Sequence, residues 1–135
     1  WVNGQGEEFV AAYRSDSMGL QRLIKTGVQA MVLSTETDPV VAARCKKIGL
    51  AHIQGVGDKA AVLRGYLEEH QIAPQTVVYV GNDINDLPCF GLVGCAVAVA
   101  DAQPEVLPQA DLVLTRSGGH GAVREICDMI LNNRQ

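Results

Sequence analysis

The sequence predicts a three-layer, doubly wound α/β domain built on a mainly parallel sheet. Short apolar runs rich in β-branched residues alternate with stretches of helical periodicity along all 135 residues. Several of these runs end in glycine or small polar residues, which is typical of the carboxyl edge of an open parallel sheet, where ligands bind. We therefore expect one α/β domain over residues 1–135.

The first half begins with an expected β-hairpin over residues 1–13, because an Asn/Gly/Gln turn separates two extended segments. Ser15–Ser17 offers capping side chains for a short amphipathic helix, and a buried strand follows at 30–33. The next helix starts with Asp38 as its N-cap and a proline at its first position, and it ends at Gly49.

The second half repeats the alternation. A strand over 51–53 leads into a helix with Asp58 as N-cap. The central strand, 77–80, is apolar on both faces, which predicts cover on both sides, and Gly81 lets the chain turn at its end. Beyond it we expect a helix at 87–92, a strand at 96–100, a helical turn opening at Pro104, a strand at 112–114 and a helix with an apolar stripe from Val123 to Leu131.

Charge and composition exclude several classes of partner. The formal net charge of −4 and the pI near 5.2 argue against nucleic acid or an anionic membrane surface. No apolar run is long enough to span a bilayer, so we expect no membrane partner. The cysteines form no C-x-x-C pair, which favours reduced thiols in a cytoplasmic protein; they are Cys45, Cys89, Cys95 and Cys127.

A cluster of polar side chains follows the central strand. Asn82, Asp83 and Asp86 place hard oxygen ligands within five residues, a composition that suits Mg²⁺. The alternative is an acidic turn before the next helix, with Asp86 as the N-cap of that helix.

Two more polar residues follow other expected strands: Ser34 after the strand at 30–33, and Lys59 at a helix start. Together with the acidic cluster they form a receptor suited to a phosphoryl group, whose transfer needs its oxygens held and its charge neutralised. Taken singly, Ser34 fits a turn cap and Lys59 a solvated helix residue. Because Lys59 lies off the apolar stripe, we expect it to serve phosphate binding and not folding.

In this order the motifs resemble the haloacid-dehalogenase-like phosphatases, which have a Rossmann-like fold. The likeness extends to their small cap-less branch, which includes 3-deoxy-D-manno-octulosonate 8-phosphate phosphatases and C-terminal domains of N-acylneuraminate cytidylyltransferases. The segments that carry it are Val32-Leu33-Ser34, Gly55 to Lys59, Gly81 to Asp86, Val97 to Ala102, Ala110-Asp111 and Gly118 to Glu125.

The resemblance implies roles for individual residues. Ser34 matches the residue that binds a phosphoryl oxygen, Lys59 matches the cation beside nucleophile and phosphate, and Asn82, Asp83 and Asp86 match the motif that holds Mg²⁺. Further substrate-binding candidates are Thr35, Arg14 and Arg44. The branch also implies a homotetramer in which hairpins such as residues 1–13 close a neighbour's active site in place of a cap domain.

This sequence departs from the family in two places that affect catalysis. The family's nucleophile lies in a D-x-D motif on the first strand, and nothing here matches it, so we expect that strand and motif to be missing from the chain. Asn82 stands where the family usually has a metal-binding aspartate, and its amide brings no charge. Glu36, where octulosonate-phosphate phosphatases tend to have arginine, moves the likeness towards the sialic-acid side of the branch.

The leading hypothesis is a Mg²⁺-dependent phosphatase domain for a phosphorylated eight- or nine-carbon keto-sugar acid. The alternative is a non-catalytic oligomerisation domain of an N-acylneuraminate cytidylyltransferase, which the missing motif and Asn82 favour slightly. A response-regulator-like receiver domain needs an acidic pair and a phospho-acceptor strand, and the sequence offers neither.

Overall fold

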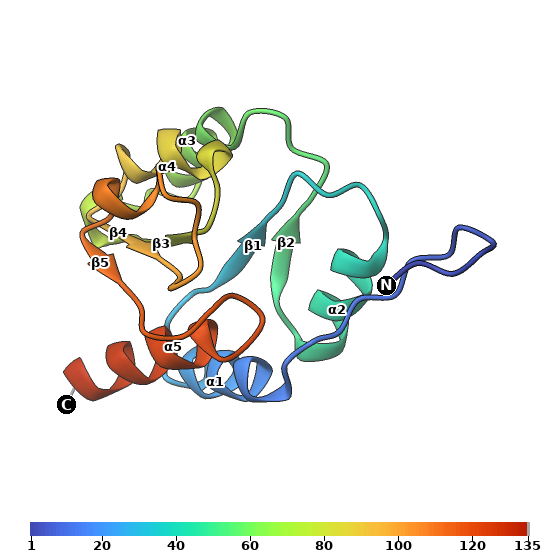
Figure 1. The fold of residues 1–135 in the computed structure, drawn as a ribbon. Helices are drawn as coiled ribbons and strands as arrows, with labels where there is room; N and C mark the ends of the chain where they lie inside the picture. The colour runs from blue at the N-terminus through green and yellow to red at the C-terminus, as the bar shows by residue number, and fades with distance from the viewer. Residues whose placement is uncertain (135) are drawn as a thin grey trace.

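The computed structural model describes residues 1–134 and confirms the α/β class, with strands and helices alternating after an N-terminal hairpin (Figure 1). The pairings among strands β1 to β5 are all parallel. The helices and strands are α1 (Arg14–Lys25), β1 (Met31–Leu33), α2 (Val40–Ile48), β2 (Ala51–Ile53), α3 (Lys59–Glu69), β3 (Val78–Gly81), α4 (Leu87–Phe90), β4 (Cys95–Ala98), β5 (Leu112–Val113) and α5 (Ala122–Asn133), with short 3₁₀ turns at Pro74–Thr76, Ile84–Asp86 and Leu107–Gln109.

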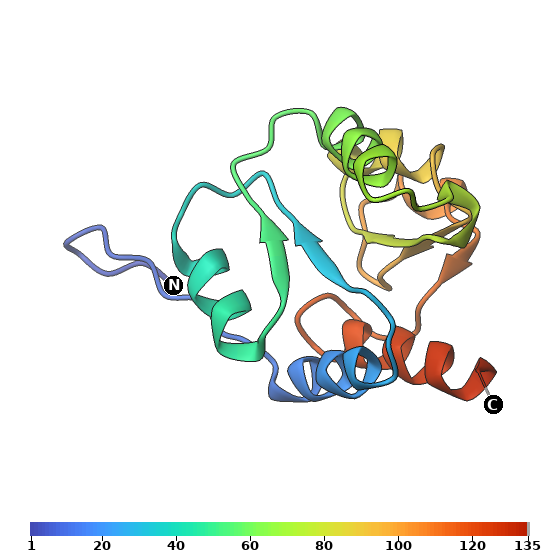
Figure 2. The same ribbon diagram turned by 180° about the vertical axis from the view of Figure 1, so that it is seen from behind.

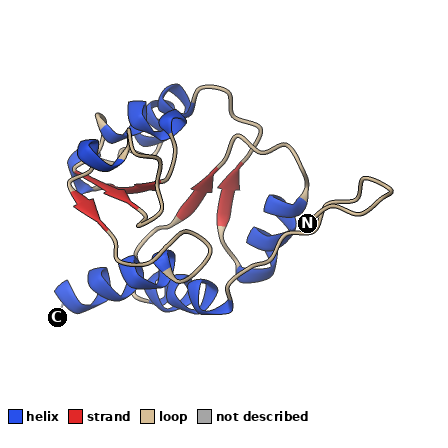
Figure 3. Ribbon diagram, in the orientation of Figure 1, coloured by secondary structure: helices blue, strands red, loops and turns tan. Residues whose placement is uncertain are grey.

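The strands form two separate sheets, β1-β2 and β3-β4-β5, where the sequence predicts one (Figure 3). Met31 pairs with Ala51 in the first sheet, and Val78 pairs with Cys95 in the second. Within residues 1–134, β1 and β3 each pair with one neighbour only, so each keeps one unpaired edge. The predicted cover of β3 on both sides is wrong at Val78, which is 40% exposed.

Helices cover both faces of the larger sheet (Figures 1 and 2). Ile126 and Ala122 of α5 pack with the buried Val97 and Ala98 of β4 on one face. On the other face, α3 and α4 form a second cluster with Cys89 at its centre. This burial of apolar surface is the main force that holds the layers together.

Helices α1 and α5 cross in close contact, because Gly19 leaves room at the crossing. A Cβ at Gly19 would lie 2.9 Å from Cδ and 3.2 Å from Cα of Arg124. The sequence suggested that Ser15–Ser17 caps helix α1. The helix begins at Arg14, so these residues lie inside its first turn and do not cap it. Asp16 instead accepts a 2.8 Å hydrogen bond from the Arg124 N–H at the start of α5.

The N-terminal hairpin is present in a minimal form. One antiparallel bridge joins Val2 and Glu8, and the Phe9 N–H donates to the Trp1 carbonyl at 2.7 Å. The ribbon extends away from the rest of the molecule (Figure 2) and leaves Trp1, Phe9 and Val10 exposed. A two-stranded ribbon this short has little stability of its own in water.

Most helix boundaries agree with the sequence to within one or two residues. Asp58 caps α3 and accepts from the Ala61 N–H at 3.0 Å, and Gly49 ends α2 in the left-handed conformation. The N-cap of α2 is Pro39 and not Asp38, one residue later than predicted, although Asp38 accepts from the Val40 N–H at 2.8 Å. In the described part of the chain the four cysteines are free, and no helix is long and apolar enough to cross a bilayer.

Candidate active site

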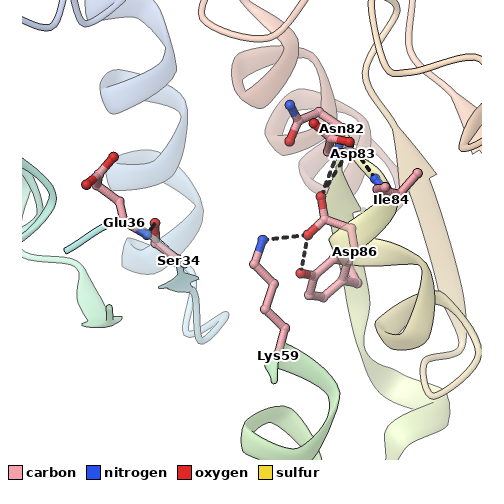
Figure 4. A network of polar contacts seen from close by, with 8 residues as sticks. Ser34, Glu36, Lys59, Asn82, Asp83, Ile84 and Asp86 are labelled. Atoms are coloured by element: carbon pink, nitrogen blue, oxygen red, sulfur yellow. Dashed lines mark hydrogen bonds and ion pairs between the residues drawn. The ribbon is translucent and has the colours of Figure 1, made fainter. Parts of the chain in front are cut away.

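Lys59, Asp86 and Tyr79 form a buried polar network near the carboxyl end of β3. Figure 4 labels Lys59 and Asp86 within it. The Lys59 ammonium lies 2.7 Å from Oδ1 of Asp86, and the Tyr79 hydroxyl donates to the same oxygen at 2.7 Å. Asp86 is only 2% exposed, and the Lys59 side chain is 11% exposed. Three elements meet here, because Lys59 opens α3, Tyr79 lies on β3 and Asp86 ends the 3₁₀ turn that follows.

The second oxygen of Asp86 organises the loop after β3. Oδ2 accepts from the backbone N–H groups of Asn82 at 2.9 Å and Asp83 at 3.2 Å. A Cβ at Gly81 would lie 2.6 Å from Cβ of Asp86, so only glycine lets the loop turn this tightly. Asp86 occupies the N-cap position of α4, as the alternative interpretation placed it, but its side chain makes no capping hydrogen bond to that helix.

The hydrogen bonds decide the charge state of Asp86. Burial by itself raises the pKa of a carboxyl group, but the bonds from Lys59, Tyr79 and the Asn82 N–H outweigh it and hold the Asp86 pKa below its ordinary value. Burial and the neighbouring carboxylate raise the pKa of Tyr79. The site therefore holds an ionised Asp86 beside Lys59. Lys59 is a phosphate-binding candidate, but it is also part of the buried structure. The expectation that it serves phosphate binding and not folding is thus too narrow.

The predicted metal ligands differ in how free their oxygens are. The exposed Asn82 side chain makes no hydrogen bond within residues 1–134, while Oδ1 of Asp83 accepts from the Ile84 N–H at 2.7 Å. Both oxygens of Asp86 already accept two donors each. In the same described range no three His, Cys, Asp or Glu side chains gather as a metal site. Asn82 and Asp83 are hard oxygen donors that fit Mg²⁺, with one formal charge between them.

Ser34 lies at the end of β1, in a loop that closes on itself. Its hydroxyl accepts from the Glu36 N–H at 3.0 Å, and Oε1 of Glu36 accepts from the N–H groups of Thr37 and Asp38. The loop after β2 bonds to this one, since the Val56 N–H donates to the Ser34 carbonyl at 3.1 Å. Figure 4 shows Ser34 at the end of one strand, apart from Lys59 and Asp86, which come from two other segments; within residues 1–134 no hydrogen bond joins Ser34 to either of them.

The other predicted substrate-binding residues have different surroundings. Thr35 and Arg14 are exposed, at the end of β1 and the start of α1. The Arg44 guanidinium donates to the Ser17 hydroxyl, which links α2 to α1 and uses part of its donor capacity. Substrate binding by these three residues stays a prediction.

Sequence reasoning missed several residues that shape the site. In the sequence, Tyr79 looks like an ordinary strand residue. The available signal was its hydroxyl group, because a hydroxyl inside an otherwise apolar strand needs a buried hydrogen-bond partner. Asp101 and Glu125 were noted only as parts of typical segments, yet each binds backbone N–H groups of the loop after β5. Arg116 was not singled out.

The sequence pattern of the haloacid dehalogenase-like hydrolases matches residues 49–126. The chain is 37% identical over 132 residues to the 3-deoxy-D-manno-octulosonate 8-phosphate phosphatase of Escherichia coli K12, covering 97% of this chain and 70% of that protein. The fold and the match show that this chain belongs to the haloacid dehalogenase-like hydrolases.

Solved structures agree with this family. A haloacid-dehalogenase-family hydrolase of Streptomyces avermitilis is 46% identical with a TM-score of 0.95, over 99% of this chain and 77% of that one. The 3-deoxy-D-manno-octulosonate 8-phosphate phosphatase of Moraxella catarrhalis is 32% identical with a TM-score of 0.93, over 98% of this chain and 76% of that one. That structure contains a magnesium ion, a phosphate ion and the sugar acid. The Escherichia coli relative and the Moraxella catarrhalis structure are thus both named as phosphatases of a sugar-acid phosphate.

Proposed function

We propose that this chain provides most of the active site of a Mg²⁺-dependent phosphatase for a phosphorylated eight- or nine-carbon keto-sugar acid. The observation that carries the proposal is the buried Lys59–Asp86 pair, which Tyr79 and the loop after β3 hold at the carboxyl end of the sheet. The curated relatives, named as phosphatases of 3-deoxy-D-manno-octulosonate 8-phosphate, support the substrate class.

The residues divide the work on the phosphoryl group. Lys59 supplies a positive charge for the phosphoryl oxygens. Its hydrogen bond to Asp86 fixes the position of the ammonium group. The Ser34 hydroxyl holds one phosphoryl oxygen, and its present bond from the Glu36 N–H sets the direction of its free proton. Asn82 and Asp83 would hold Mg²⁺, which supplies further charge to neutralise the phosphoryl oxygens when it is bound.

The nucleophile is proposed to be an aspartate on a strand that completes the sheet between β1 and β3. Two observations support this: within residues 1–134, β1 and β3 are edge strands of two parallel sheets, and no D-x-D occurs in the 135 residues. The aspartate oxygen would form a bond to phosphorus as the ester oxygen leaves and takes up a proton, and water would then hydrolyse the aspartyl-phosphate.

Assembly into a homotetramer is a further part of the proposal. The exposed apolar residues of the hairpin, Trp1, Val2, Phe9 and Val10, support it, because a ribbon of this kind gains stability by packing against a neighbour. A subunit so placed would also exclude water from the site, which no cap domain covers within residues 1–134.

Binding to the chain as it stands tests the phosphate site. Calorimetry with Mg²⁺ and 3-deoxy-D-manno-octulosonate 8-phosphate should show binding, and Ser34→Ala should weaken it by about tenfold, the effect of one hydrogen bond to a charged group. The matched control is Thr76→Ala, which removes an exposed hydroxyl just before the amino end of β3, away from the proposed substrate contacts, and should leave the affinity unchanged. Equal affinity for Ser34→Ala and the control would contradict the proposed site, and absence of binding would favour the non-catalytic oligomerisation domain.

A further inference from the structure

The loop after β5, residues 115–121, is exposed but firmly held. The Glu125 carboxylate accepts from the N–H groups of Thr115 at 3.0 Å and Arg116 at 2.9 Å, and Asp101 accepts from the Gly118 N–H at 2.8 Å. Burial by itself raises the pKa of Glu125, but these bonds outweigh it and keep that pKa low. Charge-assisted bonds to consecutive backbone groups order a loop, so the side chains it carries have fixed positions.

Backbone hydrogen bonds connect this loop to the proposed metal loop. The Gln103 N–H donates to the Asn82 carbonyl at 2.9 Å, and the Ala100 N–H donates to the Arg116 carbonyl at 3.0 Å. Arg116 therefore lies at the same carboxyl edge as Asn82, two strands along the sheet. Adjacent strands are about 4.8 Å apart, which places the two backbones on the order of 10 Å from each other.

The Arg116 side chain lies across Gly121, which has a positive φ of 105°. A Cβ at Gly121 would lie 2.8 Å from Cδ and 3.2 Å from Nη1 of Arg116, and 3.4 Å from Cε1 of Tyr13. The absence of a side chain at Gly121 thus leaves space for the aliphatic part of Arg116 beside the ring of Tyr13.

The guanidinium group makes no ion pair and no hydrogen bond within residues 1–134, although its charge also helps to lower the pKa of the nearby Glu125. Both carboxylate oxygens of the nearby Glu125 accept hydrogen bonds from backbone N–H groups and the Thr115 hydroxyl. A seated arginine with a free planar fork is suited to bind a carboxylate through two parallel hydrogen bonds.

We infer that Arg116 binds the carboxylate of the sugar-acid substrate, at the opposite end from the phosphate. The inference rests on the proposed function, because that function puts the phosphate at Lys59 and Ser34. Seven carbon–carbon bonds of about 1.5 Å span on the order of 9 Å, which is close to the separation of Arg116 from the metal loop, where the proposed Mg²⁺ would hold the phosphoryl oxygens. Recognition of both ends then selects acids of this length over shorter sugar phosphates.

A pair of probes separates carboxylate recognition from phosphate recognition. Calorimetry compares 3-deoxy-D-manno-octulosonate 8-phosphate with glucose 6-phosphate, which has a phosphate and no carboxylate. Arg116→Ala should weaken the first by about tenfold to a hundredfold and leave the second unchanged. Arg116→Lys should recover part of the loss, because it keeps the charge but not the fork. Arg64→Ala, an exposed arginine on α3, is the matched control and should change neither.

The outcomes distinguish this inference from the proposed function. If Arg116→Ala weakens both probes equally, or neither, carboxylate binding by Arg116 is wrong while the phosphate site stands. If the unaltered chain binds neither probe, the proposed phosphate site is wrong and the inference fails with it.

Discussion

Replacing Lys59 with alanine measures how much the buried ion pair contributes to stability. Removing one partner of a buried pair typically costs about 3–5 kcal/mol, because the other charge loses its compensation. Asp86 keeps its donors from Tyr79 and from the backbone of Asn82 and Asp83. The loss is therefore closer to that of one hydrogen bond to a charged group, and we expect the free energy of unfolding to fall by about 2–3 kcal/mol at neutral pH.

The effect of pH on this loss has a defined sign. Burial raises the pKa of Asp86 in the folded state, but hydrogen bonds outweigh burial and hold this pKa below its usual value. Ionised Asp86 therefore contributes stability above the unfolded pKa of about 3.9, and the contribution is lost as pH falls through the folded pKa. Since Lys59 is one source of the depressed pKa, the gap between the parent protein and Lys59→Ala should be full above about pH 4 and shrink below it.

Urea unfolding followed by far-UV circular dichroism is the suitable assay. Fluorescence would report poorly on the core, because the single tryptophan, Trp1, is 86% exposed in the hairpin. Lys47→Ala removes an exposed lysine from α2 and serves as the control, with an expected change within about 0.5 kcal/mol. If the two variants are equally stable from pH 3 to pH 7, Lys59 does not stabilise the fold and our account of the ion pair is wrong.

Three other predictions follow from the same geometry. Gly81→Ala should cost at least about 1–3 kcal/mol in urea unfolding because its methyl group collides with Asp86, whereas Gly65→Ala on α3, with open space around it, should stabilise by about 0.5–1 kcal/mol; equal effects would contradict the close approach. Asn82→Asp adds a carboxylate and should tighten Mg²⁺ binding by about tenfold in calorimetry, and unchanged affinity would remove this residue from the ligand set. Light scattering should show a tetramer that Phe9→Ser with Val10→Ser disrupts, and a parent protein that stays monomeric at high concentration would refute the assembly.

The local rules of sequence predicted much of the fold. Alternating apolar runs located the five strands of residues 1–134, and the cap at Asp58 and the glycine at Gly49 were placed correctly, while the start of α2 lies one residue later than predicted, with Pro39 and not Asp38 as its N-cap. These features depend on neighbours along the chain. The same rules misplaced the role of Ser15–Ser17, because Asp16 caps α5, a helix more than a hundred residues away.

The candidate site was predictable in its residue types and not in its contacts. The sequence pointed to Lys59 and Asp86, but not to the 2.7 Å pair that removes Asp86 from solvent. Tyr79 and Arg116 became visible only through packing, since their partners come from other elements. The division into two sheets was equally hidden, because strand order is a long-range property.

The central claim is that this chain forms a phosphatase site once a nucleophilic aspartate is supplied. The direct measurement is phosphate release from 3-deoxy-D-manno-octulosonate 8-phosphate, with and without Mg²⁺, by this chain joined at Trp1 to an apolar strand that carries Asp-x-Asp. We predict Mg²⁺-dependent release that falls to the level of the unjoined chain when the first aspartate of the motif is changed to asparagine. A joined protein that folds and binds the sugar acid phosphate but releases no phosphate would contradict the claim.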